Sequence, residues 1–101
     1  MTIAATIEIP VEALADLCRR YQVKELSLFG SAAREELRPD SDIDILVEFV
    51  PNHTVDIFDF GHLEDELRAL LGRSVDLVSR KGMNPRVAPF ILRDARRLYA
   101  P

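Results

Sequence analysis

The sequence predicts a small α/β (α+β) domain in which about four helices pack on a three-stranded mixed sheet. The main observation is that apolar residues recur first at helical and then at strand spacing, and that this switch repeats along the chain. The second observation is the length of 101 residues, of which 48% are hydrophobic, enough for one core. We therefore expect residues 1–101 to form a single domain.

The first helix is predicted to follow an extended segment over 1–9. Pro10 suits the first turn of a helix, where its fixed φ angle fits and its missing N–H is not needed. Apolar residues then follow at helical spacing from Val11 through Cys18 to Tyr21. Because Cys18 lies on this stripe and is the only cysteine, we expect a buried structural thiol and no internal disulfide.

A strand, a short helix and a second strand are predicted next. The stretch ELSLF over 25–29 alternates like a strand, and Gly30 interrupts it before SAAREEL, a short helix with Ser31 near its N-terminus. After a turn over 38–41, the stretch DIDILVEF over 42–49 alternates again. This alternation gathers the acidic residues of the second strand on the face opposite its isoleucines.

The second half of the chain predicts a helix, a third strand and a last helix. Thr54 is the expected N-cap of the first of these helices, and Gly72 is its expected end. The stretch SVDLVS over 74–79 predicts the third strand. The last helix is expected to fill much of 84–99, with Pro89 delaying its start or bending it.

The charge of the chain excludes a non-specific nucleic-acid binder, since the formal net charge is −4. A basic stretch over 80–97 is the exception, with six Lys and Arg residues against one acid. It can face an acidic partner, nucleotide phosphates or only solvent, and these alternatives stay open. The sequence has neither a membrane-spanning apolar run nor a basic-then-apolar leader, which predicts a cytoplasmic protein without a membrane partner.

Three aspartates are the candidate metal ligands: Asp42, Asp44 and Asp76. Side chains i and i+2 of a strand share a face, with Cα atoms roughly 6.5–7 Å apart, so Asp42 and Asp44 repel each other. A divalent ion removes this repulsion, and hard Mg²⁺ prefers carboxylate and phosphate oxygens. Asp76 can lie beside the pair and complete a two-metal phosphoryl-transfer site. Taken alone, however, these acids favour a plainer interpretation as a turn cap or a solvated face.

The Gly30-Ser31 pair shifts the balance toward the metal site. A glycine between a strand and a helix lets the backbone approach a ligand closely. The free N–H groups at the start of a helix favour an anion, and a serine hydroxyl adds a donor. A candidate phosphate-binding turn at Gly30-Ser31 thus precedes a strand with candidate metal-binding aspartates. Found together in this order, the turn and the aspartates predict a site better than either does alone.

Gly30-Ser31, ten further residues and then Asp42-Ile43-Asp44 match the signature of the polymerase-beta-like nucleotidyltransferases. The stretches LSLFGSAAR, RPDSDIDILVEF and GRSVDLVSRKG also resemble the minimal nucleotidyltransferases, abbreviated MNT. The resemblance covers about Pro10 to Tyr99 and implies the polymerase-beta-like nucleotidyltransferase fold.

The resemblance also implies roles for individual residues. Asp42, Asp44 and Asp76 would hold two Mg²⁺ ions, while Gly30 and Ser31 would contact the phosphates of ATP, the substrate. Arg34 is implied as an additional nucleotide-binding residue. The next residue departs from the family, which often has glycine where this chain has Glu35, and a negative charge there can weaken nucleotide binding or face solvent.

The implied function is that of an antitoxin. Proteins of the MNT type are commonly encoded beside HEPN-domain toxins and can transfer AMP from ATP to a tyrosine of the toxin, in a hetero-oligomeric complex. By analogy, this chain would be a protein adenylyltransferase that silences its partner, with Asp76 the best candidate to help deprotonate the tyrosine. Three alternatives stay open: an antitoxin that acts by binding alone, a small-molecule nucleotidyltransferase, and an unrelated α/β domain.

Overall fold

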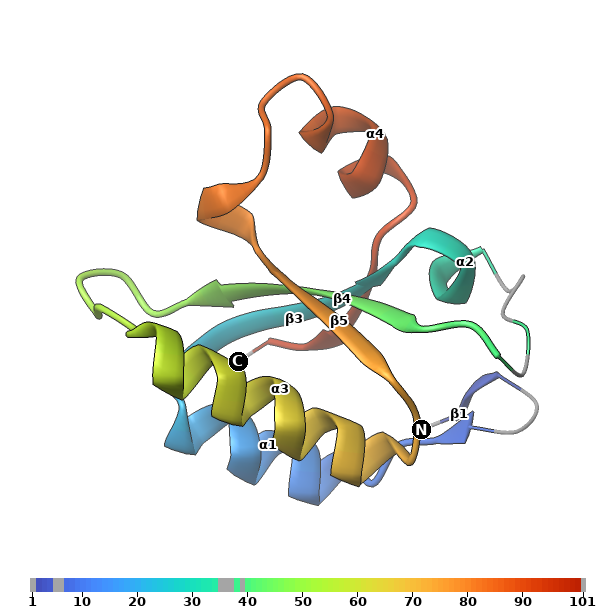
Figure 1. Cartoon of the computed structure of the whole chain (residues 1–101), viewed down its shortest axis with the longest axis horizontal. Coiled ribbons are helices and arrows are strands. Elements are labelled where there is room, and N and C mark those ends of the chain that lie inside the picture. The colour runs from blue at the N-terminus through green and yellow to red at the C-terminus, as the bar shows by residue number, and fades with distance from the viewer. Residues whose placement is uncertain (1, 5–6, 35–37, 39, 101) are drawn as a thin grey trace.

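The fold is built on a four-stranded mixed sheet with helical segments on both of its faces (Figure 1). This computed structural model describes residues 2–4, 7–34, 38 and 40–100. The strands of the main sheet are β3 (Val23–Phe29), β4 (Ile43–Phe49), β5 (Val75–Ser79) and β6 (Arg96–Tyr99). Their spatial order is β5-β4-β3-β6, in which only β4 and β5 run parallel.

Two long helices cover one face of the sheet, and a shorter segment stands over the other (Figure 1). The long helices are α1 (Val11–Arg20) and α3 (Ile57–Leu71), and they lie side by side. The opposite face carries η1 (Arg80–Gly82) and α4 (Ala88–Arg93), which together link β5 to β6. The remaining elements are the short helix α2 (Gly30–Ala33) and a hairpin of β1 (Thr2–Ala4) and β2 (Ile7–Glu8).

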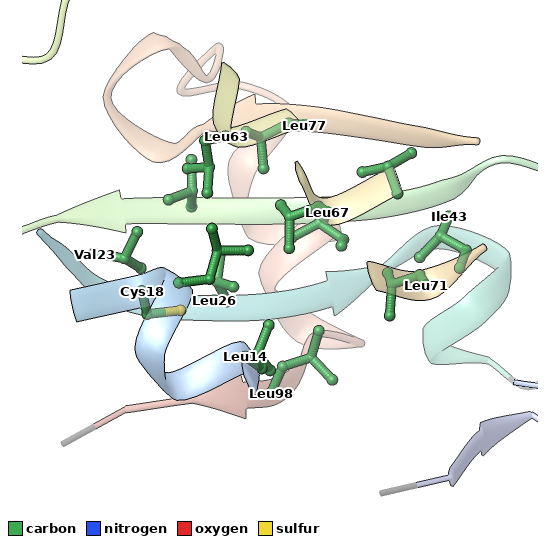
Figure 2. Close-up of a cluster of buried hydrophobic side chains, with 14 of the residues drawn as sticks. Leu14, Cys18, Val23, Leu26, Ile43, Leu63, Leu67, Leu71, Leu77 and Leu98 are labelled. Atoms are coloured by element: carbon green, nitrogen blue, oxygen red, sulfur yellow. The ribbon is translucent and has the colours of Figure 1, made fainter. Parts of the chain in front are cut away.

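The hydrophobic core lies between the sheet and the pair α1 and α3 (Figure 2). Leu14 and Cys18 of α1 and Leu63 and Leu67 of α3 are at most 2% exposed. They pack on the isoleucine face of β4, as the alternation predicts. The acidic face of β4 is therefore directed away from the core, toward α4.

The apolar stripe of α1 is only partly as predicted. Cys18 is fully buried, which confirms the structural thiol. Val11 is 53% exposed, so its assignment to the stripe is wrong, and Leu17 contributes to the core instead. Pro10 takes the position just before the helix in an extended conformation, consistent with the predicted start.

The α+β class and the mixed sheet are confirmed, but the predicted count of three strands is wrong. A fourth strand, β6, pairs antiparallel with β3 where the last helix was expected to continue. That helix, α4, has only six residues and carries Pro89 in its first turn, where a missing N–H costs nothing. It ends at Arg93 because the chain must return to the open edge of β3, whose backbone groups need partners.

The predicted ends of α3 are half right. Gly72 has φ +67° and ends the helix in the left-handed conformation that glycine adopts without strain. The predicted N-cap, Thr54, is wrong, because the helix starts two residues later. Asp56 caps it, and its carboxylate accepts a hydrogen bond of 2.7 Å from the backbone N–H of Asp59.

Within the part of the chain that the structure describes, no helix combines the length and apolar character needed to cross a bilayer.

Candidate active site

Two of the three predicted aspartates are direct neighbours across the sheet. Asp44 of β4 and Asp76 of β5 occupy paired positions in the parallel register. Neighbouring strands lie about 4.8 Å apart, so the two carboxylates leave the sheet side by side. Both belong to the face that α1 and α3 leave uncovered. The sequence analysis expected Asp76 to lie beside the pair of Asp42 and Asp44, and the parallel register places it next to Asp44.

The pKa of Asp44 is shifted by its burial and by the neighbouring charged groups. Burial raises its pKa above the usual value, and the charges of Asp76 and Asp42 raise it further. Arg34 acts in the opposite direction and lowers the pKa of Asp44. Repulsion among these carboxylates is the condition that a bound cation relieves.

Gly30 lies directly against the carboxylate of Asp44. It has φ +65°, a left-handed conformation that favours glycine, and it follows Phe29, the cross-strand partner of Asp44. A Cβ atom at position 30 would overlap Oδ2 of Asp44. The end of β3 therefore meets the acidic face of β4 without a side chain between them, which brings the backbone of α2 next to the acids.

The remaining predicted residues are placed less fully. Asp42 lies just before β4 and is exposed, and Arg34 directly follows α2 and is also exposed. Ser31 is the second residue of α2, but its side chain is outside what the structure describes. Glu35, the departure from the family pattern, lies outside the described residues altogether.

The described residues contain no group of three Asp, Glu, His or Cys side chains that converges tightly enough to hold one ion. The chemistry of the donors nevertheless suits Mg²⁺, because Asp44 and Asp76 are paired, Asp42 is within electrostatic reach, and all three offer carboxylate oxygens. Metal binding by Asp42, Asp44 and Asp76 therefore stays a prediction.

A cavity farther along the same face of β4 was missed by the sequence analysis. It has a volume of about 240 Å³ and lies between the sheet and α4. Its floor includes Leu46, two residues beyond Asp44 on the same face of β4, and Leu92 of α4 forms part of its wall. The only sequence signal was Leu46, an apolar residue on the acidic face, which needs a cover that α4 supplies.

The basic stretch over 80–97 is partly neutralised inside the molecule. Arg80 pairs with Glu48 at 3.6 Å, and Arg97 pairs with Glu25 at 3.2 Å. Both pairs border the 240 Å³ cavity. Arg80 and Arg97 thus balance acids of the sheet while their side chains stay 46% and 67% exposed, so the solvated-face alternative remains open.

Comparison with known families gives the class of protein to which this fold belongs. The model of the nucleotidyltransferase domain matches residues 11–98. The chain therefore belongs to the nucleotidyltransferase domain family and is a nucleotidyltransferase.

Individual relatives refine this class. The chain is 41% identical over 81 residues to the protein adenylyltransferase MntA of Thermococcus cleftensis, covering 78% of each chain. It is 42% identical to a candidate minimal nucleotidyltransferase of known structure, with a TM-score of 0.71, covering 84% of this chain and 85% of the other. These relatives agree with the resemblance to the minimal nucleotidyltransferases.

A more distant structural match has a partner chain. The fold superimposes with a TM-score of 0.65 on a chain from the complex of a tri-AMPylated Shewanella oneidensis HEPN toxin with an MNT antitoxin. The identity is 22%, and the match covers 90% of this chain and 70% of that one. At this identity the match establishes a common fold.

Proposed function

We propose that this protein is a Mg²⁺-dependent adenylyltransferase that moves AMP from ATP to a tyrosine of a HEPN-domain toxin and thereby acts as its antitoxin. The observation that carries the proposal is the cross-strand pairing of Asp44 with Asp76, with Gly30 against Asp44. This arrangement gathers carboxylates where a glycine backbone turn also approaches them, which suits a metal-bound triphosphate.

The proposed acceptor rests on the relatives. The MntA relative is named a protein adenylyltransferase, and the MNT antitoxin of the structural match is in complex with a HEPN toxin that carries AMP. A protein acceptor also suits the size of this domain, because a partner can bring its own tyrosine to the acidic face of β4.

In the proposed reaction the tyrosine oxygen attacks the α-phosphorus of ATP in line, its proton is lost, and pyrophosphate leaves. Asp42, Asp44 and Asp76 would hold the Mg²⁺ ions, which supply the positive charge that stabilises the phosphates. Asp76 is the candidate to accept the proton of the tyrosine. Gly30 and Ser31 would orient the phosphates, with Arg34 adding a positive charge close to Asp44.

An antitoxin that works by binding alone is the second candidate. The observation in its favour is that no three potential ligands converge tightly among the described residues. In that case the acids would be a remnant of a catalytic site, and complex formation would need neither ATP nor metal.

The experiment is the intact mass of the partner toxin after incubation with this protein, ATP and Mg²⁺. The control is the double variant Asp42→Ala/Asp44→Ala, which is expected to stay folded because it removes carboxylate repulsion. The proposal predicts a gain of one or more AMP units with the wild type and none with the control. A stable complex with both proteins and no mass gain would favour the binding-only antitoxin.

A further inference from the structure

The strand that carries Asp76 is held on its open edge by two charged side chains of α3. Among the strands that the structure describes, β5 lies at the edge of the sheet, and none of them pairs with its outer backbone groups. The N–H of Leu77 instead donates to Oε2 of Glu64 at 3.0 Å, and Arg68 donates to the carbonyl of Val75 at 3.3 Å. The residues on both sides of Asp76 are therefore fixed by side chains of one helix.

Glu64 and Arg68 also bind each other. Arg68 donates to Oε1 of Glu64 at 2.9 Å, so one carboxylate joins the strand and the guanidinium. The sequence explains the pair, since Glu64 and Arg68 are four residues apart on one face of a helix. Glu64 is 23% exposed and Arg68 45% exposed, so the side chains are only partly solvated. Together they replace the missing strand neighbour of β5 at the position of Asp76.

The turn that leads into Asp42 is held by a third charged residue. Arg73 donates from its Nη2 atom to the carbonyl oxygen of Ser41, at 2.6 Å, and to that of Arg38. The turn is closed internally by the N–H of Ser41, which donates to the carbonyl of Arg38 at 3.0 Å. Arg73 thus binds the carbonyl groups of the first and last residues of the turn that immediately precedes Asp42.

These contacts act on two segments that are already connected. The N–H of Ile43 donates to the carbonyl of Ser74 at 2.9 Å, which ties the start of β4 to the start of β5. Arg73 is the residue before Ser74, so one short segment after α3 is bonded to both aspartate strands. Carboxylates that repel each other need such support, because their own interaction favours separation.

We propose that Glu64, Arg68 and Arg73, here called the backbone clamp, are positioning residues that fix the spacing of Asp42 and Asp76 for metal binding. They act through backbone contacts and touch neither nucleotide nor metal. Side chains that hydrogen-bond to metal ligands influence metal affinity without being ligands themselves, and we extend this role to contacts with the adjoining backbone. The part of this inference that concerns metal rests on the proposed function.

The first test measures Mn²⁺ binding by electron paramagnetic resonance, with no partner and no ATP present. We expect Arg73→Gln to weaken Mn²⁺ binding about tenfold, the lower end of the effect known for residues that orient metal ligands. Arg73→Lys keeps a positively charged donor group near the turn and should recover part of the loss. Glu64→Gln, which retains a carbonyl oxygen for Leu77, should bind Mn²⁺ better than Glu64→Leu.

The matched control is Arg20→Gln. Arg20 of α1 pairs with Glu66 of α3 at 3.0 Å. Arg20→Gln therefore removes one positive charge, as Arg73→Gln does, and breaks a contact with α3, the helix that carries Glu64 and Arg68. It is expected to bind Mn²⁺ as the wild type does. The inference is overturned if Arg73→Gln binds Mn²⁺ normally, or if Arg20→Gln weakens binding as much, which would indicate a general loss of stability.

A second readout is independent of metal. Amide hydrogen exchange of the peptides that span 40–44 and 74–78 is expected to rise severalfold in Arg73→Gln and Glu64→Leu, and to stay unchanged in Arg20→Gln. Unchanged exchange in the first two variants contradicts the clamp. If the wild type binds no Mn²⁺ but hydrogen exchange rises in the two variants as expected, the metal site is contradicted and the backbone clamp is supported.

Discussion

At the scale of single residues, Gly30 has two separate reasons to be glycine. Its φ of +65° disfavours any other residue, and a Cβ atom would overlap the carboxylate of Asp44. Gly72 has almost the same φ, +67°, but a Cβ atom there would meet nothing within 4 Å. A substitution at Gly72 therefore tests backbone strain alone, whereas the same substitution at Gly30 tests backbone strain together with contact with Asp44.

We expect both Gly30→Ala and Gly72→Ala to lower the free energy of unfolding, by about 1–2 kcal/mol for the left-handed backbone alone. Only Gly30→Ala should also displace Asp44 and abolish Mn²⁺ binding and adenylyl transfer. Chemical denaturation and metal titration of the two variants check this. A Gly30→Ala variant with normal metal binding would mean that the contact with Asp44 is unimportant.

Asp44 is expected to reduce stability while serving function. Its pKa in the folded protein lies above the ordinary 3.8, so the folded state binds this proton more tightly than the unfolded state does. The protonated form of Asp44 therefore favours folding relative to the ionised form. This advantage is complete below pH 3.8 and is lost as the pH rises through the folded-state pKa.

Asp44→Asn should therefore raise the Tm by a few degrees at neutral pH while abolishing transfer. The gain in Tm should shrink as the pH falls toward 3.8, where the wild-type carboxyl group is protonated too. Thermal melts of wild type and variant across this range provide the measurement. A Tm that falls in Asp44→Asn at neutral pH would assign the residue a structural role.

At the scale of elements, the start of α3 depends on one side chain. Asp56 accepts a hydrogen bond from the N–H of Asp59, whereas Thr54 lies two residues outside the helix. Asp56→Ala should lower the free energy of unfolding by about 1 kcal/mol, and Thr54→Ala should change it little. The loss corresponds to a fall in Tm of roughly 4–8 °C for a domain of this size. Equal effects of the two variants in thermal melts would argue against Asp56 as the cap.

Also at this scale, the errors of the sequence-based prediction fall where long-range pairing decides. The short stretch 96–99 has too few residues to show an alternation, and it becomes a strand because the edge of β3 offers hydrogen-bond partners. The longer β4 and α3 were predicted well, because their apolar faces repeat several times and match the core.

At the scale of the whole molecule, Cys18 reports on the integrity of the core between α1 and the sheet. Burial raises the pKa of its thiol from 9.0 to about 12. The thiolate is the reactive form, and a pKa of about 12 leaves very little of it near neutral pH. We expect Cys18 to resist a thiol reagent in the folded protein and to react at once in guanidinium chloride. Rapid reaction under native conditions would mean that the core opens readily.

The raised pKa of Cys18 also predicts that the protein loses stability at alkaline pH. The contribution of the neutral thiol to folding is complete below pH 9.0 and is lost as the pH rises toward about 12. A Cys18→Ala variant lacks this dependence, so the difference in free energy of unfolding between wild type and variant should shrink as the pH rises through this window. Denaturant melts at several alkaline pH values check the convergence.

The sequence by itself determined where the candidate site residues lie along the chain and which face of β4 its aspartates take. The spacing of Gly30, Asp42 and Asp44 and the alternation of β4 were enough to predict a carboxylate site on the uncovered face of a sheet, because local periodicity decides which face a side chain takes. Only the tertiary structure decided that Asp76 stands beside Asp44, and that side chains of α3 hold the edge of β5. Strand pairing and contacts between distant segments depend on the packing of the whole chain, which no local pattern encodes.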